Sequence, residues 1–251
     1  RNANLKYFLS GEIFEQFFVF DMPISIAKSL SIQGRVVGAL LLREIITRYG
    51  RHNIGMLWLF VEPMLFTLGV SAVWYLAKLH SISNIPIVAF AITGYSSVLI
   101  WRNTASRCAK AIEPNLSLMY HRNVKVIDIF LSRIILELLG ITASLFSLTM
   151  FFTYIDVMKW PADFFLALQG WILLGWFAFG LGLIVGAISE RSETFERIWH
   201  IFVYLYFPFS GAAFMVEWLP ESARNVLLLL PSVHGVEMLR HGFFGDVVIT
   251  H

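Results

Sequence analysis

The first candidate for chemistry in this sequence is a carboxylate, Glu62, that lies within a long apolar run at residues 54–77. An ionised group inside a membrane is costly, so a carboxylate at that depth is a functional candidate by default. Pro63 follows it directly and breaks the helical hydrogen-bond ladder at that point. A structural carboxylate, paired with an arginine or with backbone groups, is therefore the alternative to a functional one.

Residue patterns that would indicate an enzyme are missing. The sequence has no G-x-x-x-x-G-K-[ST] loop for a nucleotide phosphate, no H-E-x-x-H pair and no G-x-S-x-G elbow. Its single cysteine, Cys108, excludes an internal disulfide and a multi-thiolate metal site. The sequence predicts a chain that is not an enzyme and that binds no cofactor or metal of its own.

The composition is that of a membrane protein. Hydrophobic residues make up 57%, charged residues 14%, and the mean hydropathy is +0.70, whereas soluble proteins average roughly 45–50% and 25%. We therefore expect an all-α integral membrane protein with no nucleic-acid partner. Five spans are expected at residues 54–77, 85–101, 128–155, 164–189 and 198–216, the last broken near Pro208 and Gly211.

The stretch at residues 217–232 is different from the spans. Its apolar core lies between Pro220 and Pro231 and is too short to cross a bilayer. It predicts a re-entrant or interfacial hairpin, which is stable at depth only when packed against protein or a water-filled path.

Residues 38–49 predict an amphipathic helix that lies in the membrane–water interface. Arg43, Glu44 and Arg48 fall on the face opposite the apolar side chains. We expect the charged face to meet lipid phosphates and water. With this helix in the cytoplasm, 15 of the 19 Lys and Arg fall on the cytoplasmic side. That bias predicts a multi-pass protein with a cytoplasmic N-terminus. The chain then ends outside, unless a sixth span is missing.

Aromatic side chains within the spans have two interpretations. Their rings could stack on sugar faces along a translocation path, or form the aromatic belts found at membrane interfaces. Tyr95 and Trp176 lie deep in their spans and are the better path candidates, whereas Trp101 lies at a span end, where a belt is favoured.

The polar loop EPNLSLMYHRNV, residues 113–124, carries Pro114 where a short helix would begin. A short helix between two spans is what a membrane subunit needs to dock a soluble motor. A solvated basic loop is the alternative.

Five motifs carry a resemblance to a known family: LLLREIITRYGRHNIGMLWLFVEPML, TGYSSVLIWRN, NLSLMYHRNVKVIDIFLSRIILE, FAFGLGLIVGAIS and PSVHGVEMLRHGFFGD. In this order they resemble the ABC-2 type permeases, most closely the inner-membrane permease subunit of Gram-negative capsule polysaccharide exporters. The resemblance begins near residue 29. It divides the chain into a segment of unknown role, 1–28, and an ABC-2 transmembrane domain, 29–251.

The resemblance implies a homodimer in the bacterial inner membrane, with an N-terminal interface helix, six spans and re-entrant periplasmic helices in each protomer. Two separate ATP-binding cassette subunits would bind and hydrolyse Mg-ATP. The substrate would be an acidic, lipid-linked polysaccharide, passed to a periplasmic adaptor of the co-polymerase type.

Carried onto this sequence, the interface helix is 38–49, with Arg43, Glu44 and Arg48. The coupling helix lies within 113–123, and a second contact with the ATPase is 190–197. The coupling residues are Glu113, Pro114, Asn115, Leu116, Ser117, Tyr120 and His121. The translocation path is assigned to Glu62, Tyr95, Trp101, Arg102 and Trp176. Alternatives are an exporter of O-antigen or teichoic-acid precursors with the same architecture and, in a different class, a passive channel.

Overall fold

The computed structural model describes residues 26–49, 53–76, 85–121 and 124–245. The regular structure in these ranges is helical throughout, which confirms the predicted all-α fold for the described residues. The chain divides into two units, Arg1–Arg35 and Val36–His251. The described part of the first unit is residues 26–35, the start of one helix, so the arrangement that follows is that of the second unit.

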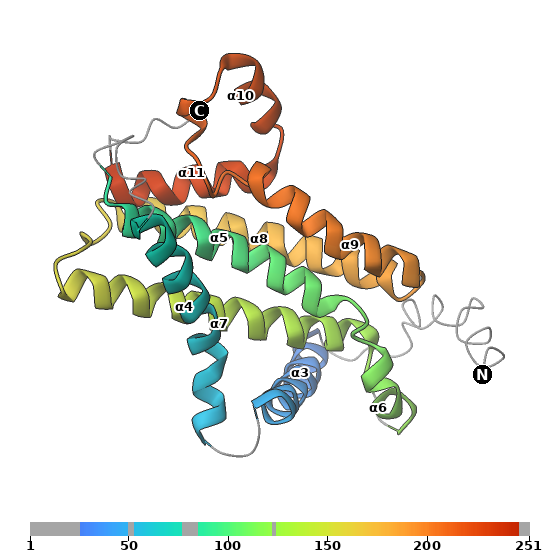
Figure 1. Cartoon of the computed structure of the whole chain (residues 1–251). Helices are drawn as coiled ribbons and strands as arrows, with labels where there is room; N and C mark the ends of the chain where they lie inside the picture. Colours follow the sequence, from blue (N-terminus) through green and yellow to red (C-terminus); the bar gives the residue numbers. More distant parts are fainter. Residues whose placement is uncertain (1–25, 50–52, 77–84, 122–123, 246–251) are drawn as a thin grey trace. The chain divides into compact units, whose positions relative to one another are not determined.

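Five long helices and several short ones make up the described chain (Figure 1). The long ones are α3 (Ile26–Tyr49), α4 (Asn53–Leu76), α5 (Ile87–Cys108), α7 (Val126–Tyr154) and α8 (Phe164–Ser189). The short ones are η2 (Glu113–Asn115), α6 (Leu116–His121), α9 (Glu193–Tyr206), η3 (Phe207–Phe209), η4 (Val216–Trp218), α10 (Glu221–Leu227) and α11 (Pro231–Phe244).

Two of the predicted spans match helices that are long and apolar enough to cross a membrane. These are α7 and α8, and a shorter apolar stretch, Met64–Val73, lies within α4. The predicted span at 85–101 overlaps α5, which begins at Ile87 and continues to Cys108. The fifth predicted run, residues 198–216, overlaps α9 and contains η3. Ser192 accepts a hydrogen bond from the Phe195 N–H at 3.2 Å, so this cap starts α9 at Glu193.

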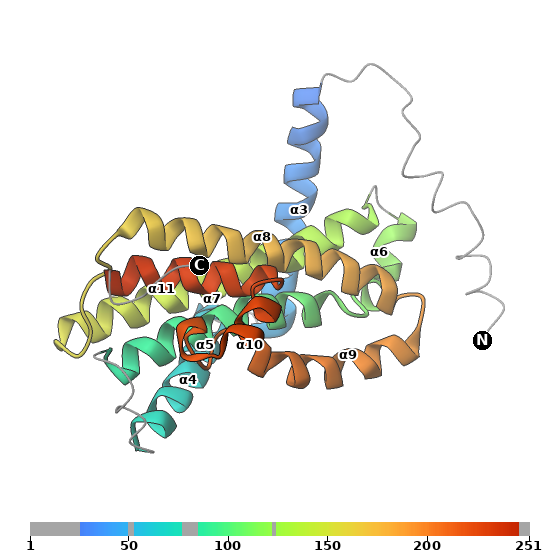
Figure 2. The same cartoon turned by 90° about the horizontal axis from the view of Figure 1, so that it is seen from above.

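Figures 1 and 2 show α5, α8 and α11 side by side. Glycines bring α8 and α11 together, because a Cβ on Gly170 would lie 2.9 Å from the Leu239 Cα, and one on Gly242 would lie 2.6 Å from the Ala167 Cα. α5 packs against α4, α7 and α8, and its middle is buried. The largest fully buried apolar side chains of the core include Ile92, Leu99, Trp101, Leu148, Leu174 and Leu239.

The expected hairpin at 217–232 contains η4, the seven-residue helix α10 and the first residues of α11. Pro231 lies in the first turn of α11, where its missing N–H has no helical partner to lose. The residue pattern did not predict α11 as an element.

Arg240 of α11 holds the segment that follows η3. Its guanidinium donates to the carbonyls of Gly211 and Phe214, each at 2.7 Å, and to the carbonyl of Ala212. It also lies 3.9 Å from the centroid of the Phe90 ring on α5. A buried charge needs such partners, and the carbonyls of the non-helical segment between η3 and η4 supply them.

Candidate functional site

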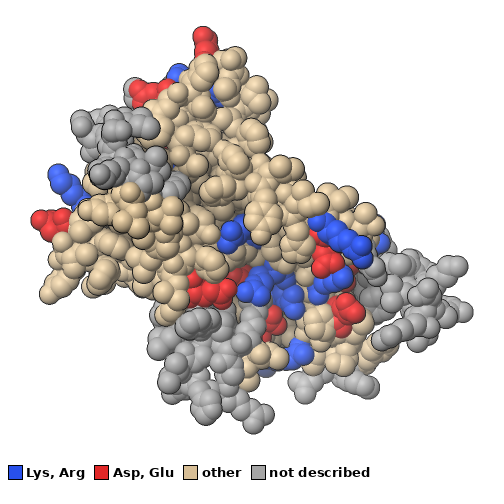
Figure 3. All heavy atoms as spheres, viewed as in Figure 1, with Lys and Arg blue, Asp and Glu red and all other residues tan. Residues whose placement is uncertain are grey.

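The charged side chains of the second unit gather where α5 and α8 end. Figure 3 shows Lys and Arg interleaved with Asp and Glu over this end, whereas much of the other visible surface is neither. The segment after α5 is bound to the end of α8, the α8–α9 turn and the start of α9 by three contacts. The Lys110 N–H donates to Ser189 Oγ at 3.3 Å, and the Ile112 N–H donates to Glu190 Oε1 at 2.8 Å. The third is an ion pair of 2.7 Å between Lys110 and Glu196.

Glu190 lies just beyond α8 and is only partly exposed. Burial raises the pKa of its carboxyl, and the nearby Glu113 carboxylate raises it further. The hydrogen bond from Ile112 and the cations Arg133 and Lys110 act in the opposite direction. The hydrogen bond from Ile112 therefore fixes the Glu190 carboxylate where the two loops meet, although burial disfavours its charged form.

The predicted coupling segment forms η2 and α6, so the expected short helix with Pro114 in its first turn is confirmed. Its residues differ in exposure. Glu113, Pro114, Ser117 and Tyr120 are exposed, with Tyr120 at 75%. Leu116 is partly buried and Asn115 is buried, its Nδ2 donating to the Ala111 carbonyl at 2.8 Å. The His121 side chain and residues 122–123 lie outside the described residues.

Two side chains of α3 turn toward protein and not toward water, which corrects the expected orientation of the charged face. Arg43 donates to the Asn115 side chain, and Glu44 Oε1 lies 3.3 Å from Arg133 Nε. These groups find charged or polar partners on η2 and α7, so they lose little by leaving water. On the other face Leu42 and Ile46 are exposed, as a membrane-facing side would be. The Arg48 side chain lies outside the described residues.

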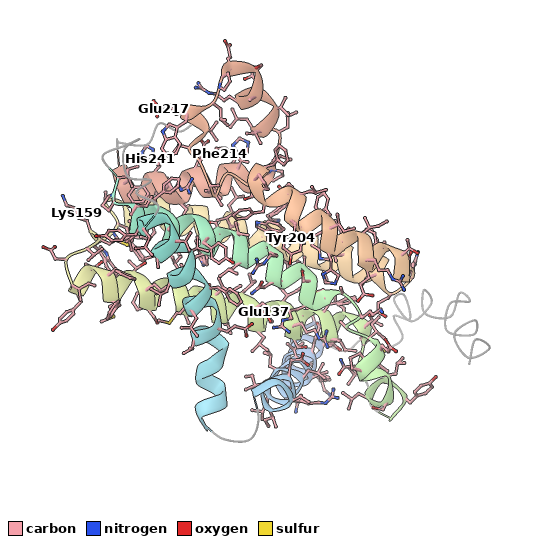
Figure 4. All side chains as sticks on the ribbon, viewed as in Figure 1. Glu137, Lys159, Tyr204, Phe214, Glu217 and His241 are labelled. Carbon is pink, nitrogen blue, oxygen red and sulfur yellow. The ribbon has the colours of Figure 1, made fainter. Side chains whose placement is uncertain are left out.

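Glu62 lies on α4 and meets a cation. Its carboxylate is 4.0 Å from Arg107, which is itself 3.4 Å from Glu137 of α7. Glu137 is nearly buried (labelled in Figure 4). This is the paired arrangement that was the alternative to a free carboxylate in the span.

The candidate path residues do not form one cluster. The Arg102 guanidinium lies 5.8 Å from the ring centroid of Tyr95, both on α5 and both partly buried. Trp101 is 1% exposed and packs edge-on against Tyr206, with ring centroids 5.0 Å apart. The ring of Trp101 therefore faces the protein interior, whereas the rings of an interfacial belt lie at the membrane surface.

Trp176 lies on α8, 74% exposed and stacked on Phe179. It lines an apolar hollow of about 320 Å³ between α7 and α8, together with Leu138, Thr142 and Trp171. The structure thus separates an α5 pair, Tyr95 with Arg102, from a ring on the surface of α8.

Several residues of the charged end escaped the sequence reasoning. Arg133 and Glu137 lie within the third predicted span and Glu196 within a predicted ATPase contact, and none was assigned a partner. Charges placed a few residues inside the start of a span are a usable signal, because such groups must be paired or reach the interface.

Comparison with known proteins identifies a family. The model of the family described as ABC-2 type transporter matches residues 35–244. The capsule polysaccharide export inner-membrane protein BexB of Haemophilus influenzae is 45% identical over 224 residues, covering 89% of this chain and 84% of the relative. The capsule polysaccharide export inner-membrane protein CtrC of Neisseria meningitidis serogroup B is 47% identical over the same shares.

A more distant relative is the polysialic acid transport protein KpsM of Escherichia coli, 29% identical over 83% of this chain and 81% of its own length. The family match covers most of the described helices, from within α3 to the end of α11. The chain therefore belongs to the ABC-2 type transporter family.

Proposed function

We propose that the chain is the permease subunit of an ATP-driven exporter that moves lipid-anchored capsular polysaccharide across the bacterial inner membrane. The single structural observation that carries the proposal is the tie between two loops. The α5–η2 segment and the α8–α9 turn are joined by Ile112 with Glu190 and by Lys110 with Glu196. Two loops joined in this way present one continuous surface to an ATPase subunit. A passive channel does not need such a surface. The relatives BexB and CtrC, both named as capsule polysaccharide export proteins, support the substrate class.

The partners follow from this role. The chain forms a homodimer, with two ATP-binding cassette subunits that hold Mg-ATP, and a periplasmic adaptor receives the acidic, lipid-linked glycan. The exposed side chains of the coupling segment dock the ATPase, with Tyr120 as the anchor, because exposed aromatic rings dominate many interfaces. The N-terminus is cytoplasmic, and α10 and α11 lie on the periplasmic side as re-entrant helices.

The path for the glycan runs past α5. The ring of Tyr95 offers a face for a sugar, and the guanidinium of Arg102 offers a partner for its carboxylates. In the mechanism, ATP closes the cassette subunits, which push on the coupling segment and on α3. That movement opens a channel at the dimer interface lined by α4, α5 and α9. Glu62 of α4 lines the entrance, and the buried Trp101 supports the wall from behind.

The proposal is tested by purifying the chain from its native membrane in mild detergent and assaying the preparation for Mg-ATP hydrolysis. Export is then measured as acidic polysaccharide that reaches the cell surface in a strain lacking the gene, with and without the chain. Co-purified ATPase activity together with restored capsule supports the proposal. Restored O-antigen or teichoic acid instead of capsule would move it to a different glycan. A preparation without an ATPase subunit would favour a passive channel and overturn it.

A further inference from the structure

Two residues assigned to the interface helix, Arg43 and Glu44, and one assigned to the ATPase contact, Asn115, direct their side chains toward other parts of the protein. Arg43, Glu44 and Asn115 pair with one another or with Arg133, and Asn115 is 4% exposed. We propose that these residues, with Arg133 at the centre, form an internal joint that makes α3, η2 and the end of α5 move as one body. The inference rests on the proposed function and names the residues that transmit its motion.

The contacts form a closed circuit through four elements. Asn115 of η2 accepts from Arg43 of α3, and the next residue of α3, Glu44, pairs with Arg133 of α7. Arg133 Nη1 then donates to the Arg107 carbonyl in the last turn of α5 at 2.7 Å. The chain itself returns from α5 to η2, and Asn115 Nδ2 braces that return on the Ala111 carbonyl at 2.8 Å. A closed circuit cannot shear at one contact without straining the others.

Arg133 is suited to the central place. Its guanidinium presents donors in a rigid fork, so one edge can face Glu44 while another serves a carbonyl that the end of α5 leaves without a helical partner. The side chains of Arg133 and Glu44 are only 12% and 16% exposed. Salt screens such a pair much less than a surface ion pair, so the link persists at cellular ionic strength.

The joint has a consequence for transport. A push on the exposed face of the coupling segment, around Tyr120, reaches α3 through Asn115 and reaches α5 through Arg133. α5 carries Tyr95 and Arg102, the pair assigned to the glycan. Arg133 is therefore a positioning residue: it touches neither ATP nor glycan, and it connects the place where force is applied to the helix that must move.

The test is a charge exchange in the full exporter, with its ATPase subunit present. Arg133→Glu and Glu44→Arg are made singly and together, and export and ATP hydrolysis are measured in the same membranes, each divided by the amount of assembled complex. Each single variant is expected to lower the glycan exported per ATP by roughly tenfold, within the usual range of coupling factors between sites. The double variant restores the ion pair but not the donor to the Arg107 carbonyl, so it is expected to recover only part of the ratio. Lys159→Glu, an exposed charge reversal at the opposite end of the helices, is the matched control and should leave the ratio unchanged (Figure 4).

A second variant guards against loss of assembly. Asn115→Ala opens the circuit at η2 while Arg43 can still reach water, and it should lower the same ratio. Unchanged export per ATP in Arg133→Glu, or a double variant no better than the single ones, would overturn the joint while ATP-dependent export by the wild type keeps the proposed function. A wild-type chain that exports nothing with ATP would overturn both.

Discussion

The Glu190 carboxylate accepts a hydrogen bond of 2.8 Å from the backbone N–H of Ile112, and so binds the turn between α8 and α9 to the segment that leads into η2. Ile112 is nearly buried, at 9% exposure, and lies past the end of α5, where no helical carbonyl serves its N–H. A buried donor without a partner costs about 1–3 kcal/mol. A carboxylate from the α8–α9 turn thus supplies the hydrogen-bond acceptor for a backbone N–H of the segment after α5.

This relationship gives a pH-dependent prediction for Glu190→Gln. Burial raises the pKa of Glu190 above its ordinary value of 4.5, so the folded protein retains this proton where the unfolded chain has lost it. Folding stability from this group therefore falls as the pH rises from 4.5 through the raised pKa. The glutamine can still accept from Ile112 and does not titrate. As the pH rises through that range, we expect the melting temperature of Glu190→Gln in detergent to increase relative to that of the wild type.

Glu221→Gln, on the exposed start of α10, is the control for this titration. Its melting curve should follow the wild type at every pH. Parallel curves for Glu190→Gln and the wild type between pH 4.5 and neutrality would show that the buried carboxylate has no part in the pH dependence.

A charge at Tyr120 should separate the chain from its ATPase. The side chain is 75% exposed on α6, so Tyr120→Asp leaves the fold intact while placing a charge where an apolar anchor is proposed. Loss of such an anchor weakens binding by about tenfold or more. The measurement is the amount of ATPase subunit that co-purifies with the tagged chain. Tyr154→Asp, 88% exposed at the far end of α7, is the control, and equal recovery with both variants would exclude α6 as the docking helix.

Leu116 offers a graded version of the same experiment. It is only partly buried, next to the buried Asn115. Leu116→Asp is therefore expected to impair both docking and the internal joint, so that export falls further than the loss of the ATPase subunit alone explains.

The long helices could be predicted from the sequence because their signal is local. α8 is a continuous apolar run and α7 is one after Glu137, and the predicted ends of both lie within two residues of the observed ones. The polar residues after Trp101 also predict that the helix of this span continues into water, and α5 does extend to Cys108. The sequence could not show that Arg102 lies near Tyr95 or that Arg107 pairs with Glu137 of α7.

The joint and α11 could not be predicted in this way. Whether Glu44 faces water or Arg133 depends on where α7 passes, about 90 residues further along the chain, and periodicity holds no such information. In α11, Gly235 and Gly242 read as helix-weakening residues. They are required because the α8 backbone or side chains occupy the space of a Cβ. A glycine that weakens its own helix can be recognised as a close-packing site only when the neighbouring helix is known.

That packing gives a prediction for α8. A Cβ on Gly170 would lie 2.9 Å from the Leu239 Cα, whereas one on Gly180 of the same helix would meet nothing within 4 Å. Gly170→Val must push α11 away, and overpacking of this kind costs about 1–3 kcal/mol. Gly180→Val changes the same residue type without a clash. We expect a lower melting temperature for Gly170→Val alone, and equal values for the two variants would contradict the close approach of α8 and α11.

Arg240 gives the last prediction, because its guanidinium is the shared partner of three carbonyls at Gly211, Ala212 and Phe214. Arg240→Met leaves those acceptors buried without a donor, at about 1–3 kcal/mol for each one that water cannot reach. Arg240→Lys keeps the charge but presents a single ammonium in place of a planar fork, so it cannot serve all three.

Both Arg240 variants should lower the melting temperature and speed protease cleavage between η3 and η4, where the segment would detach from α11. Arg197→Met, on the exposed side of α9, changes a cation of the same type without losing such contacts and should do neither. Wild-type behaviour of Arg240→Lys would show that charge alone holds the segment, through the Phe90 ring that lies 3.9 Å away. Faster cleavage of both variants would instead show that the directed hydrogen bonds from Arg240 keep the segment in place.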